Sequence, residues 1–275
     1  MLLIPGLNSI LRATVRHMLP FGTKVWARIQ AGEGEGLWLK IDPRWHNAYL
    51  EGSYEPGIQK LLREHLRPGD VFYDVGAHIG FFSMIAARLV GEKGKVFAFE
   101  AAPENVAALE QNVRRNGLPQ IEINPVAVWS KSSLVKFKRP YAGALAGAVI
   151  ELDARASEAA PELQIEVQAT TLDSFAEKHP IPRVVKIDVE GAEAEVLEGA
   201  KELFQQCRPL LICEVHHPRA EGSVCPRLKQ QGYVFDWMTG EQAFPRHLIA
   251  EFQSIAPALS SNSQHRLRVS ALTQP

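Results

Sequence analysis

The sequence predicts an α/β fold with a mostly parallel sheet that is covered by helices on both faces. Three observations predict it. From residue 70 onward, short segments rich in Val, Ile and Phe alternate with amphipathic segments of helical period. Glycine or acidic residues directly follow several of the apolar segments, as they do where parallel strands end. The chain has no internal repeat, and its 275 residues allow one large domain with a sizeable core.

Residues 1–66 are expected to form a preamble to this unit. The first 18 residues carry two arginines and no acid, which predicts a peripheral helix, with a transit peptide as the alternative. Apolar residues alternate on both sides of a Gly/Glu turn within residues 21–43, which predicts a β-hairpin. Residues 45–56 have no clean period and predict a loop, and a helix is expected over residues 58–66.

Residues 67–245 are expected to form the core. The predicted strands of this core, in chain order, are 70–75, 95–99, 121–129, 184–189, 210–215 and 233–238. The third strand contains Pro125, which cannot donate to a sheet ladder, so we expect an edge strand or a bulged one. The strand order of a doubly wound sheet also places this strand at the edge. Helices are predicted after Gly80, from Pro103, after Thr171 and as one unbroken helix over residues 193–204.

Residues 131–168 interrupt the alternation of strands and helices. A stretch of small residues at 141–148 lies between two strand-like pieces, at 134–138 and 164–168. We interpret this segment as an inserted arm that lies over the ligand site, and a disordered surface loop is the alternative. The remaining residues, 246–275, are expected to form a C-terminal strand and a loosely held tail.

Composition and charge narrow the function classes. The net charge of −1 gives the whole chain no electrostatic preference for nucleic acid or anionic membranes. The three cysteines form no C-x-x-C pair and are odd in number, which favours a reducing compartment and therefore a cytoplasmic protein. No apolar run approaches the roughly 20 residues that a membrane-spanning helix needs.

The glycine turn after the first core strand carries the first functional signal. It reads Asp74-Val-Gly-Ala-His-Ile-Gly80, and glycine permits a tight turn or a close approach to a ligand. The next strand ends at Glu100, at the offset where nucleotide-binding folds place an acid that holds ribose hydroxyls. A dinucleotide site would require glycine where His78 stands. A plain turn without a ligand is the alternative interpretation.

Polar residues also gather where the other predicted strands end. In an open α/β sheet, ligands bind outside the carboxyl ends of the strands. These residues are Asp74 and Gly76 on the first strand, Glu100 on the second, Asp188 and Glu190 on the fourth, and Glu214, His216 and His217 on the fifth. Asp188 alone could cap the next helix, and His217 alone could be solvated, but their shared location favours one ligand site.

Four motifs together resemble the FkbM family of S-adenosylmethionine-dependent methyltransferases. They are Asp74–Gly80, the block Lys186-Ile-Asp-Val-Glu-Gly-Ala-Glu193, Thr171-Leu-Asp173 and Glu214-Val-His216, and the resemblance covers roughly residues 50–240. It implies a Rossmann-like class I methyltransferase fold with a seven-stranded sheet. It also implies O-methylation of a hydroxyl on a sugar, a polyketide or another small natural product. A nicotinamide-dependent oxidoreductase and a non-catalytic ligand-binding module are the alternatives.

The resemblance and the strand-end pattern together assign the site residues. The expected cofactor-binding residues are Asp74, Gly76, Ala77, His78, Gly80, Glu100, Ala101, Val126, Ala127 and Asp188. The expected substrate-side residues are Tyr54, Glu55, Glu190, Glu214 and His217. His216 is expected to act as the general base, oriented or assisted by Asp188.

Metal and partner expectations follow from the same residues. A Mg²⁺ ion held by Asp188, Glu214 and His216 is the less favoured alternative to the general base. The expected partner is a small-molecule or glycan acceptor with a free hydroxyl, and no nucleic acid is expected. A homo-oligomer is left open.

Overall fold

The computed structural model describes residues 20, 22–42, 47–138, 164–238, 240 and 243–253. The expected N-terminal helix, the small-residue stretch of the arm and the C-terminal tail lie outside the described residues. Among the described helices, none combines the length and the apolar character that crossing a membrane requires.

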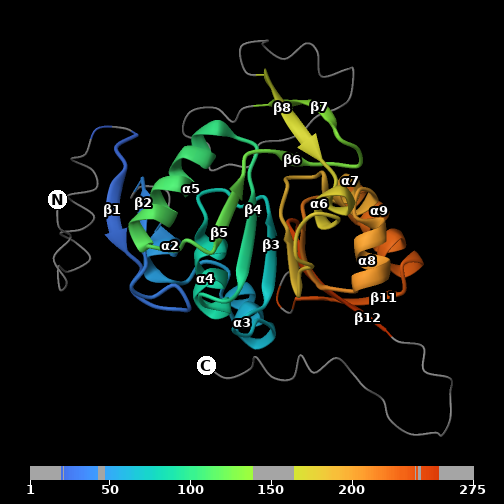
Figure 1. Ribbon diagram of the computed structural model, residues 1–275, viewed down its shortest axis with the longest axis horizontal. Coiled ribbons are helices and arrows are strands. Elements are labelled where there is room, and N and C mark those ends of the chain that lie inside the picture. Colours follow the sequence, from blue (N-terminus) through green and yellow to red (C-terminus); the bar gives the residue numbers. More distant parts are fainter. Residues whose placement is uncertain are drawn as a thin grey trace, which may run out of the picture.

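Seven strands form the main sheet, in the order β11-β12-β10-β9-β3-β4-β5 (Figure 1). Their bounds are β3 Val71–Val75, β4 Lys95–Phe99, β5 Ile121–Asn124, β9 Val184–Ile187, β10 Leu210–Val215, β11 Tyr233–Trp237 and β12 Arg246–Phe252. The five strands from β10 to β5 run parallel, whereas β12 runs antiparallel to β10 and β11. The predicted seven-stranded, mostly parallel sheet is therefore confirmed, and β12 lies within it rather than beside it.

Helices cover both faces of this sheet (Figure 1). One face carries α3 Pro56–His65, α4 Phe81–Val90 and α5 Pro103–Asn116, and the other carries α6 Leu172–Ala176, α7 Glu193–Glu198, α8 Lys201–Cys207 and α9 Pro218–Gln230. Successive residues of a strand pack into different cores. Phe72 packs into the core that contains Leu62 and Met84, whereas Tyr73 packs into the core that contains Phe175. Period-two alternation of bulky residues therefore divides the interior into two layers.

Local sequence signals explain where the helices begin and end. Pro103 stands in the first turn of α5, where its missing N–H costs nothing, and Gly117 ends the helix with a left-handed φ of 63°. At α6 the side chain of Thr171 accepts a hydrogen bond from the backbone N–H of Ser174 at 3.0 Å. Both boundaries agree with the sequence prediction.

The preamble contains the predicted hairpin and one unpredicted helix. Strands β1 (Val25–Arg28) and β2 (Trp38–Ile41) pair antiparallel, which confirms the hairpin. The predicted loop at 45–56 is wrong in part, because α2 spans Asn47–Glu51. Five residues are too few to show a helical period, and Gly52, with a φ of 74°, turns the chain directly after them.

The third predicted core strand divides at Pro125. Its first part is β5, at the edge of the main sheet as expected, and its second part is β6 (Ala127–Val128) in another sheet. There β6 pairs with β8 (Gln164–Thr170), which also pairs antiparallel with β7 (Ser133–Lys138). The two strand-like pieces of the arm are therefore confirmed as strands.

The single helix predicted over residues 193–204 is two helices, α7 and α8. The break falls at Gly199 and Ala200. A β-carbon on Gly199 would collide with the carbonyl oxygen of Trp129, and the Gly199 carbonyl accepts a hydrogen bond from the backbone N–H of Asp173 at 3.0 Å. The close approach of these segments breaks the helix, and helical periodicity alone does not reveal it.

Candidate active site

Backbone contacts around Gly76 join the carboxyl ends of β3, β4 and β9. The N–H groups of Gly76 and Ala77 donate to the Phe99 carbonyl at 3.0 and 2.9 Å. The N–H of Asp188 donates to the Val75 carbonyl at 2.9 Å. Gly76 has a φ of 84°, and a β-carbon there would collide with the Asp188 carbonyl oxygen. Glycine at this position therefore allows the Asp188 backbone to approach the turn.

The Gly76–Gly80 turn has a left-handed backbone conformation at three positions. Gly76, His78 and Gly80 all have positive φ, of 84°, 51° and 88°. A left-handed conformation is uncommon for a residue with a side chain, so His78 is held there by its contacts. Its backbone N–H donates to Glu100 Oε2 at 2.8 Å. A β-carbon on Gly80 would collide with the side chain of Leu109, so helix α5 packs directly against the turn.

Glu100 stands where β4 ends and is 8% exposed. Its Oε2 accepts from His78 and its Oε1 accepts from the Ala102 N–H, each at 2.8 Å. Burial raises the pKa of Glu100, and the backbone donors offset part of that rise. Because a carboxylate offers about four lone-pair sites, these two bonds fix its orientation and leave acceptor capacity for a ligand. Ala101 lies half-buried between Glu100 and helix α5.

A buried lysine links two of the expected site carboxylates. Lys186 is 2% exposed on β9, and its Nζ lies 3.0 Å from Asp188 Oδ2 and 3.9 Å from Asp74 Oδ1. Asp74 also accepts from the Ser83 hydroxyl at 2.5 Å. Burial opposes ionisation of Asp188, but the Lys186 ammonium more than offsets it and lowers the pKa of Asp188 to about 2. The same carboxylates raise the pKa of Lys186 despite its burial.

His216 is oriented by a carboxylate that the sequence analysis did not select. Its Nδ1 lies 2.6 Å from Oε1 of Glu193, which opens α7 and is fully buried. The Gly191 N–H donates to the same oxygen at 2.8 Å. The other ring nitrogen, Nε2, lies 3.3 Å from Glu190 Oε2 and 3.6 Å from Asp188 Oδ1. Burial lowers the pKa of His216, but Glu193 and the other acids more than offset this and raise it to about 9.

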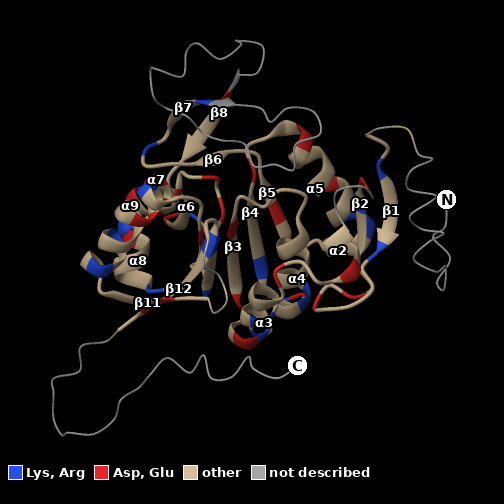
Figure 2. Ribbon diagram, turned by 180° about the vertical axis from the view of Figure 1, so that it is seen from behind, with Lys and Arg blue, Asp and Glu red and all other residues tan. Residues whose placement is uncertain are grey.

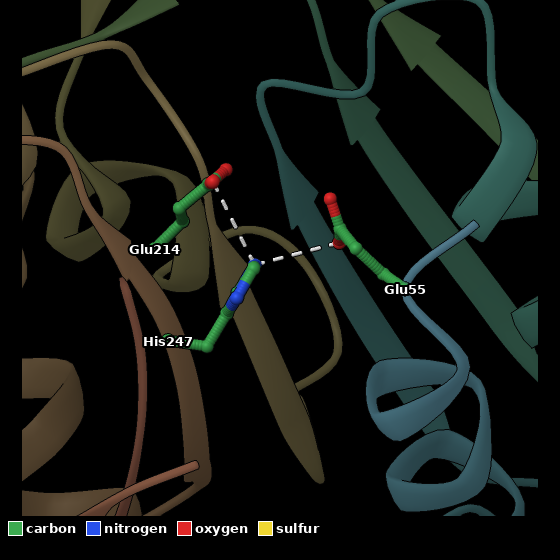
Figure 3. A group of neighbouring side chains, drawn as sticks. All are labelled: Glu55, Glu214 and His247. Atoms are coloured by element: carbon green, nitrogen blue, oxygen red, sulfur yellow. Dashed lines mark ion pairs between the residues drawn. The ribbon is translucent and has the colours of Figure 1, made fainter. Parts of the chain in front are cut away.

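Glu214 lies between two histidines. Its Oε2 is 3.7 Å from His216 Nε2, and its Oε1 is 3.9 Å from Nε2 of His247, its cross-strand partner on β12. Glu55 approaches from the start of α3, with Oε2 3.4 Å from His247 Nε2. Figure 3 shows Glu55 and His247 pointing toward one another, with Glu214 alongside. Burial and the charge of Asp188 raise the pKa of Glu214 to about 8.

Four other expected site residues, Tyr54, His217, Val126 and Ala127, have their own contacts elsewhere in the fold. The ring of Tyr54 packs on Phe81, with their centroids 5.8 Å apart, at the start of α4. His217 Nδ1 accepts from the Ala220 N–H at 3.0 Å and so caps α9. Val126 is half-buried, and Ala127 is buried in the β6 strand that pairs with β8.

Three residues of the cluster were missed by the sequence analysis: Lys186, Glu193 and His247. Lys186 offered a signal, since a lysine inside an apolar strand is rarely buried unless it is paired. Glu193 lies in the block that carries the family resemblance, but its position in the first turn of a helix suggested only a favourable dipole contact. His247 offered no such signal in the sequence, because it comes close to Glu214 only through the antiparallel pairing of β12 with β10.

The residues at the carboxyl edge of the sheet fit S-adenosylmethionine. Glu100 keeps acceptor lone pairs of the kind that ribose hydroxyls require, and the glycines of the Gly76–Gly80 turn leave room for a close backbone approach. Acidic residues gather in the chain beside α6 and α7 at this edge (Figure 2). Within the described residues, Asp74 Oδ1 is buried without a hydrogen-bond partner. An anionic surplus of this kind suits a ligand that carries a sulfonium and an ammonium group.

Two curated relatives are similar to this chain. Hexuronic acid methyltransferase AglP of Haloferax volcanii is 29% identical over 178 residues, which cover 64% of this chain and 67% of the relative. The 31-O-demethyl-FK506 methyltransferase FkbM of Streptomyces tacrolimicus is 28% identical over 241 residues, which cover 78% of this chain and 87% of the relative.

A solved structure and a family model complete the comparison. The crystal structure of the methyltransferase FkbM from Methylobacillus flagellatus KT matches with a TM-score of 0.49 at 17% identity, over 74% of this chain and 52% of that chain. This chain therefore aligns with about half the length of that protein. The model of the methyltransferase FkbM domain matches residues 74–243, well over half of the chain. The chain belongs to the FkbM family of S-adenosylmethionine-dependent methyltransferases.

Proposed function

We propose that this protein transfers a methyl group from S-adenosylmethionine to a hydroxyl oxygen of a sugar or polyketide-type small molecule. The observation that carries the proposal is the 2.6 Å contact between Glu193 and His216, beside the glycine turn at the carboxyl edge of the sheet. The relatives support the acceptor class, since one is named for a hexuronic acid and the other for 31-O-demethyl-FK506. The family match favours a methyltransferase over the nicotinamide-dependent oxidoreductase.

His216 supplies the general base. Glu193 accepts a hydrogen bond from Nδ1–H of His216. The other ring nitrogen, Nε2, faces Asp188 and Glu190 and is the one that receives a proton. An acceptor hydroxyl placed among these groups gives its proton to Nε2, and the buried Glu193 carboxylate stabilises the imidazolium that forms. The sulfonium charge of S-adenosylmethionine, when it is bound near His216, would favour the neutral imidazole ring. The neutral ring is the form that acts as a base.

The other residues hold the two reactants. S-adenosylmethionine, when bound, supplies a methyl carbon that a hydroxyl oxygen attacks as the carbon–sulfur bond breaks. Glu100 accepts hydrogen bonds from the ribose, and the backbone near Val126 and Ala127 flanks the adenine. Asp188, fixed by Lys186, borders the space between the turn and His216. The dominant contribution of the enzyme is to position the reactants in line.

The acceptor side is formed by the remaining predicted residues. These are Tyr54, Glu55, Glu190, Glu214 and His217. We favour a base over Mg²⁺ at Asp188, Glu214 and His216, although single ligand atoms of the three lie within 4.8 Å of one another. The Lys186 ammonium already neutralises Asp188, and Mg²⁺ prefers an octahedral set of oxygen ligands with several waters.

Methyl transfer is tested with purified protein, S-adenosylmethionine and a panel of uronic acids, neutral sugars and hydroxylated polyketides. Mass spectrometry detects a methylated acceptor and S-adenosylhomocysteine. His216→Asn should lower kcat by about 10²–10⁴, the usual effect of losing a general base. Glu193→Gln keeps a hydrogen-bond acceptor without the charge, so it should lower kcat by about tenfold, equivalent to about 1.4 kcal/mol.

Both variants should bind S-adenosylhomocysteine like the parent protein in titration calorimetry. His65→Gln is the matched control, since His65 lies at the end of α3 away from this cluster and should keep full activity. Normal turnover by His216→Asn would place the base elsewhere. Failure of the parent protein to bind S-adenosylhomocysteine would overturn the proposed function itself.

A further inference from the structure

We propose that Glu55, Glu214 and His247 bind one divalent transition-metal ion, a site separate from the His216–Glu193 pair. The three residues each offer one ligand atom, and these atoms lie within 4.8 Å of one another. The proposal rests on these side chains alone and does not depend on the methyl-transfer reaction.

The separations suit a shared ion. A metal bound at about 2.1 Å places two ligand atoms about 3.4 Å apart at a tetrahedral angle and at most about 4.2 Å apart. The observed separations from His247 Nε2 are 3.4 Å to Glu55 Oε2 and 3.9 Å to Glu214 Oε1. The third separation, between Glu55 and Glu214, is no more than 4.8 Å. Side-chain rotations that shorten it to about 4.2 Å or less would close a three-ligand site with an open fourth position.

Each ligand comes from a well-defined element. Glu214 and His247 are directly paired residues of β10 and β12 within the main sheet, so the backbone ladder sets their spacing. Glu55 comes from the start of α3, where its backbone has a left-handed φ of 42°. Sites built on strands hold ligands more precisely than sites on loops. Figure 3 shows the carboxylate of Glu55 and the ring of His247 pointing toward one another, with the Glu214 carboxylate beside them.

Burial and charge make an ion favourable here. His247 is 5% exposed, and the side chains of Glu55 and Glu214 are 16% and 11% exposed. Within the described chain, Glu55 Oε2 is buried and accepts no hydrogen bond. Two carboxylates and one imidazole are crowded together in this buried space, and a divalent cation between them would stabilise both carboxylates in their ionised form.

The ligand types indicate the class of metal. One imidazole nitrogen with two carboxylate oxygens suits Mn²⁺ or Zn²⁺, because imidazole suits zinc and carboxylate suits manganese. The arrangement differs from the neighbouring group of Asp188, Glu214 and His216, where the ammonium of Lys186 lies 3.0 Å from Asp188.

The test uses the full chain after dialysis against EDTA. Mn²⁺ is titrated and followed by electron paramagnetic resonance, and Zn²⁺ is titrated by calorimetry. We expect one saturable site per chain. Glu55→Gln and His247→Gln should each weaken binding by about 100-fold or more, since loss of even an outer-shell partner costs about 10–100-fold. Coupling of Mn²⁺ to an imidazole nitrogen should disappear in His247→Gln.

Three control variants make the result decisive. Glu64→Gln and His65→Gln, in the last turn of α3, should bind the metal like the parent protein. His216→Gln should also retain the site. Circular dichroism and metal-free melting temperatures establish that each variant is folded. The proposal is overturned by the absence of saturable binding, or by loss of binding in His216→Gln while Glu55→Gln and His247→Gln still bind.

Discussion

Replacing Lys186 with methionine removes a buried charge while keeping an unbranched side chain of similar length. In the parent protein, the lysine ammonium lies 3.0 Å from Asp188 and 3.9 Å from Asp74, and its side chain is 3% exposed. The Asp74 side chain is 1% exposed, so water cannot take over the role of the ammonium. The variant therefore leaves two carboxylates without their shared counter-ion.

The expected cost is large. Removing one partner of a buried ion pair destabilises a protein by about 3–5 kcal/mol. At about 2–4 °C per kcal/mol for a chain near this size, the melting temperature should fall by about 6–20 °C. Urea unfolding followed by circular dichroism gives the free energy of unfolding, and Lys178→Met, at an exposed position, should stay within about 0.5 kcal/mol of the parent.

A second substitution isolates the cause. Adding Asp188→Asn to Lys186→Met removes one of the stranded charges, so the double variant should be more stable than the sum of the two single effects by at least about 1 kcal/mol. A loss below about 1 kcal/mol for Lys186→Met, or strictly additive effects, would refute the view that Lys186 is the counter-ion of this site.

Two further predictions concern the turn and the strand end beside it. Glu100→Ala should weaken binding of S-adenosylhomocysteine by about 1.5–3 kcal/mol, the range for charge-assisted hydrogen bonds, and an unchanged dissociation constant in calorimetry would remove Glu100 from the site. Gly76→Ala should destabilise the fold by about 2–5 kcal/mol, because a β-carbon adds left-handed strain and collides with the Asp188 carbonyl. Gly222→Ala, at an open position in α9, should instead stabilise by about 0.5–1 kcal/mol, and equal melting temperatures for the two glycine variants would contradict this reasoning.

The sheet could be predicted from the sequence because its strands are short apolar runs that end at polar residues. That pattern places Asp188 and His216 at neighbouring strand ends. In the structure, Asp188 Oδ1 lies 3.6 Å from His216 Nε2. The break between α7 and α8 could not be predicted, since it results from the approach of Trp129 to Gly199, residues about 70 positions apart. Local periodicity carries no information about such a contact.

The partners of the histidines were harder to predict than the histidines themselves. Glu193 stands in a helix turn where an acid has an ordinary structural explanation, and only its full burial against His216 indicates another role. His247 meets Glu214 through antiparallel pairing of β12 with β10, and this register depends on how the end of the chain returns to the sheet. The rule that ligands bind outside the carboxyl ends of strands applies to parallel strands, so it could not predict a residue on the antiparallel strand β12.

The position of β12 between β10 and β11 also affects how the molecule is made. On the ribosome, β11 emerges before the strand that it pairs with, so it has no partner in the sheet until residues 246–252 have been synthesised. Until then β10 exposes a free edge, and free edges are where chains aggregate or pair with the wrong strand. Completion of the sheet also brings His247 beside Glu214, so this part of the cluster assembles last in synthesis.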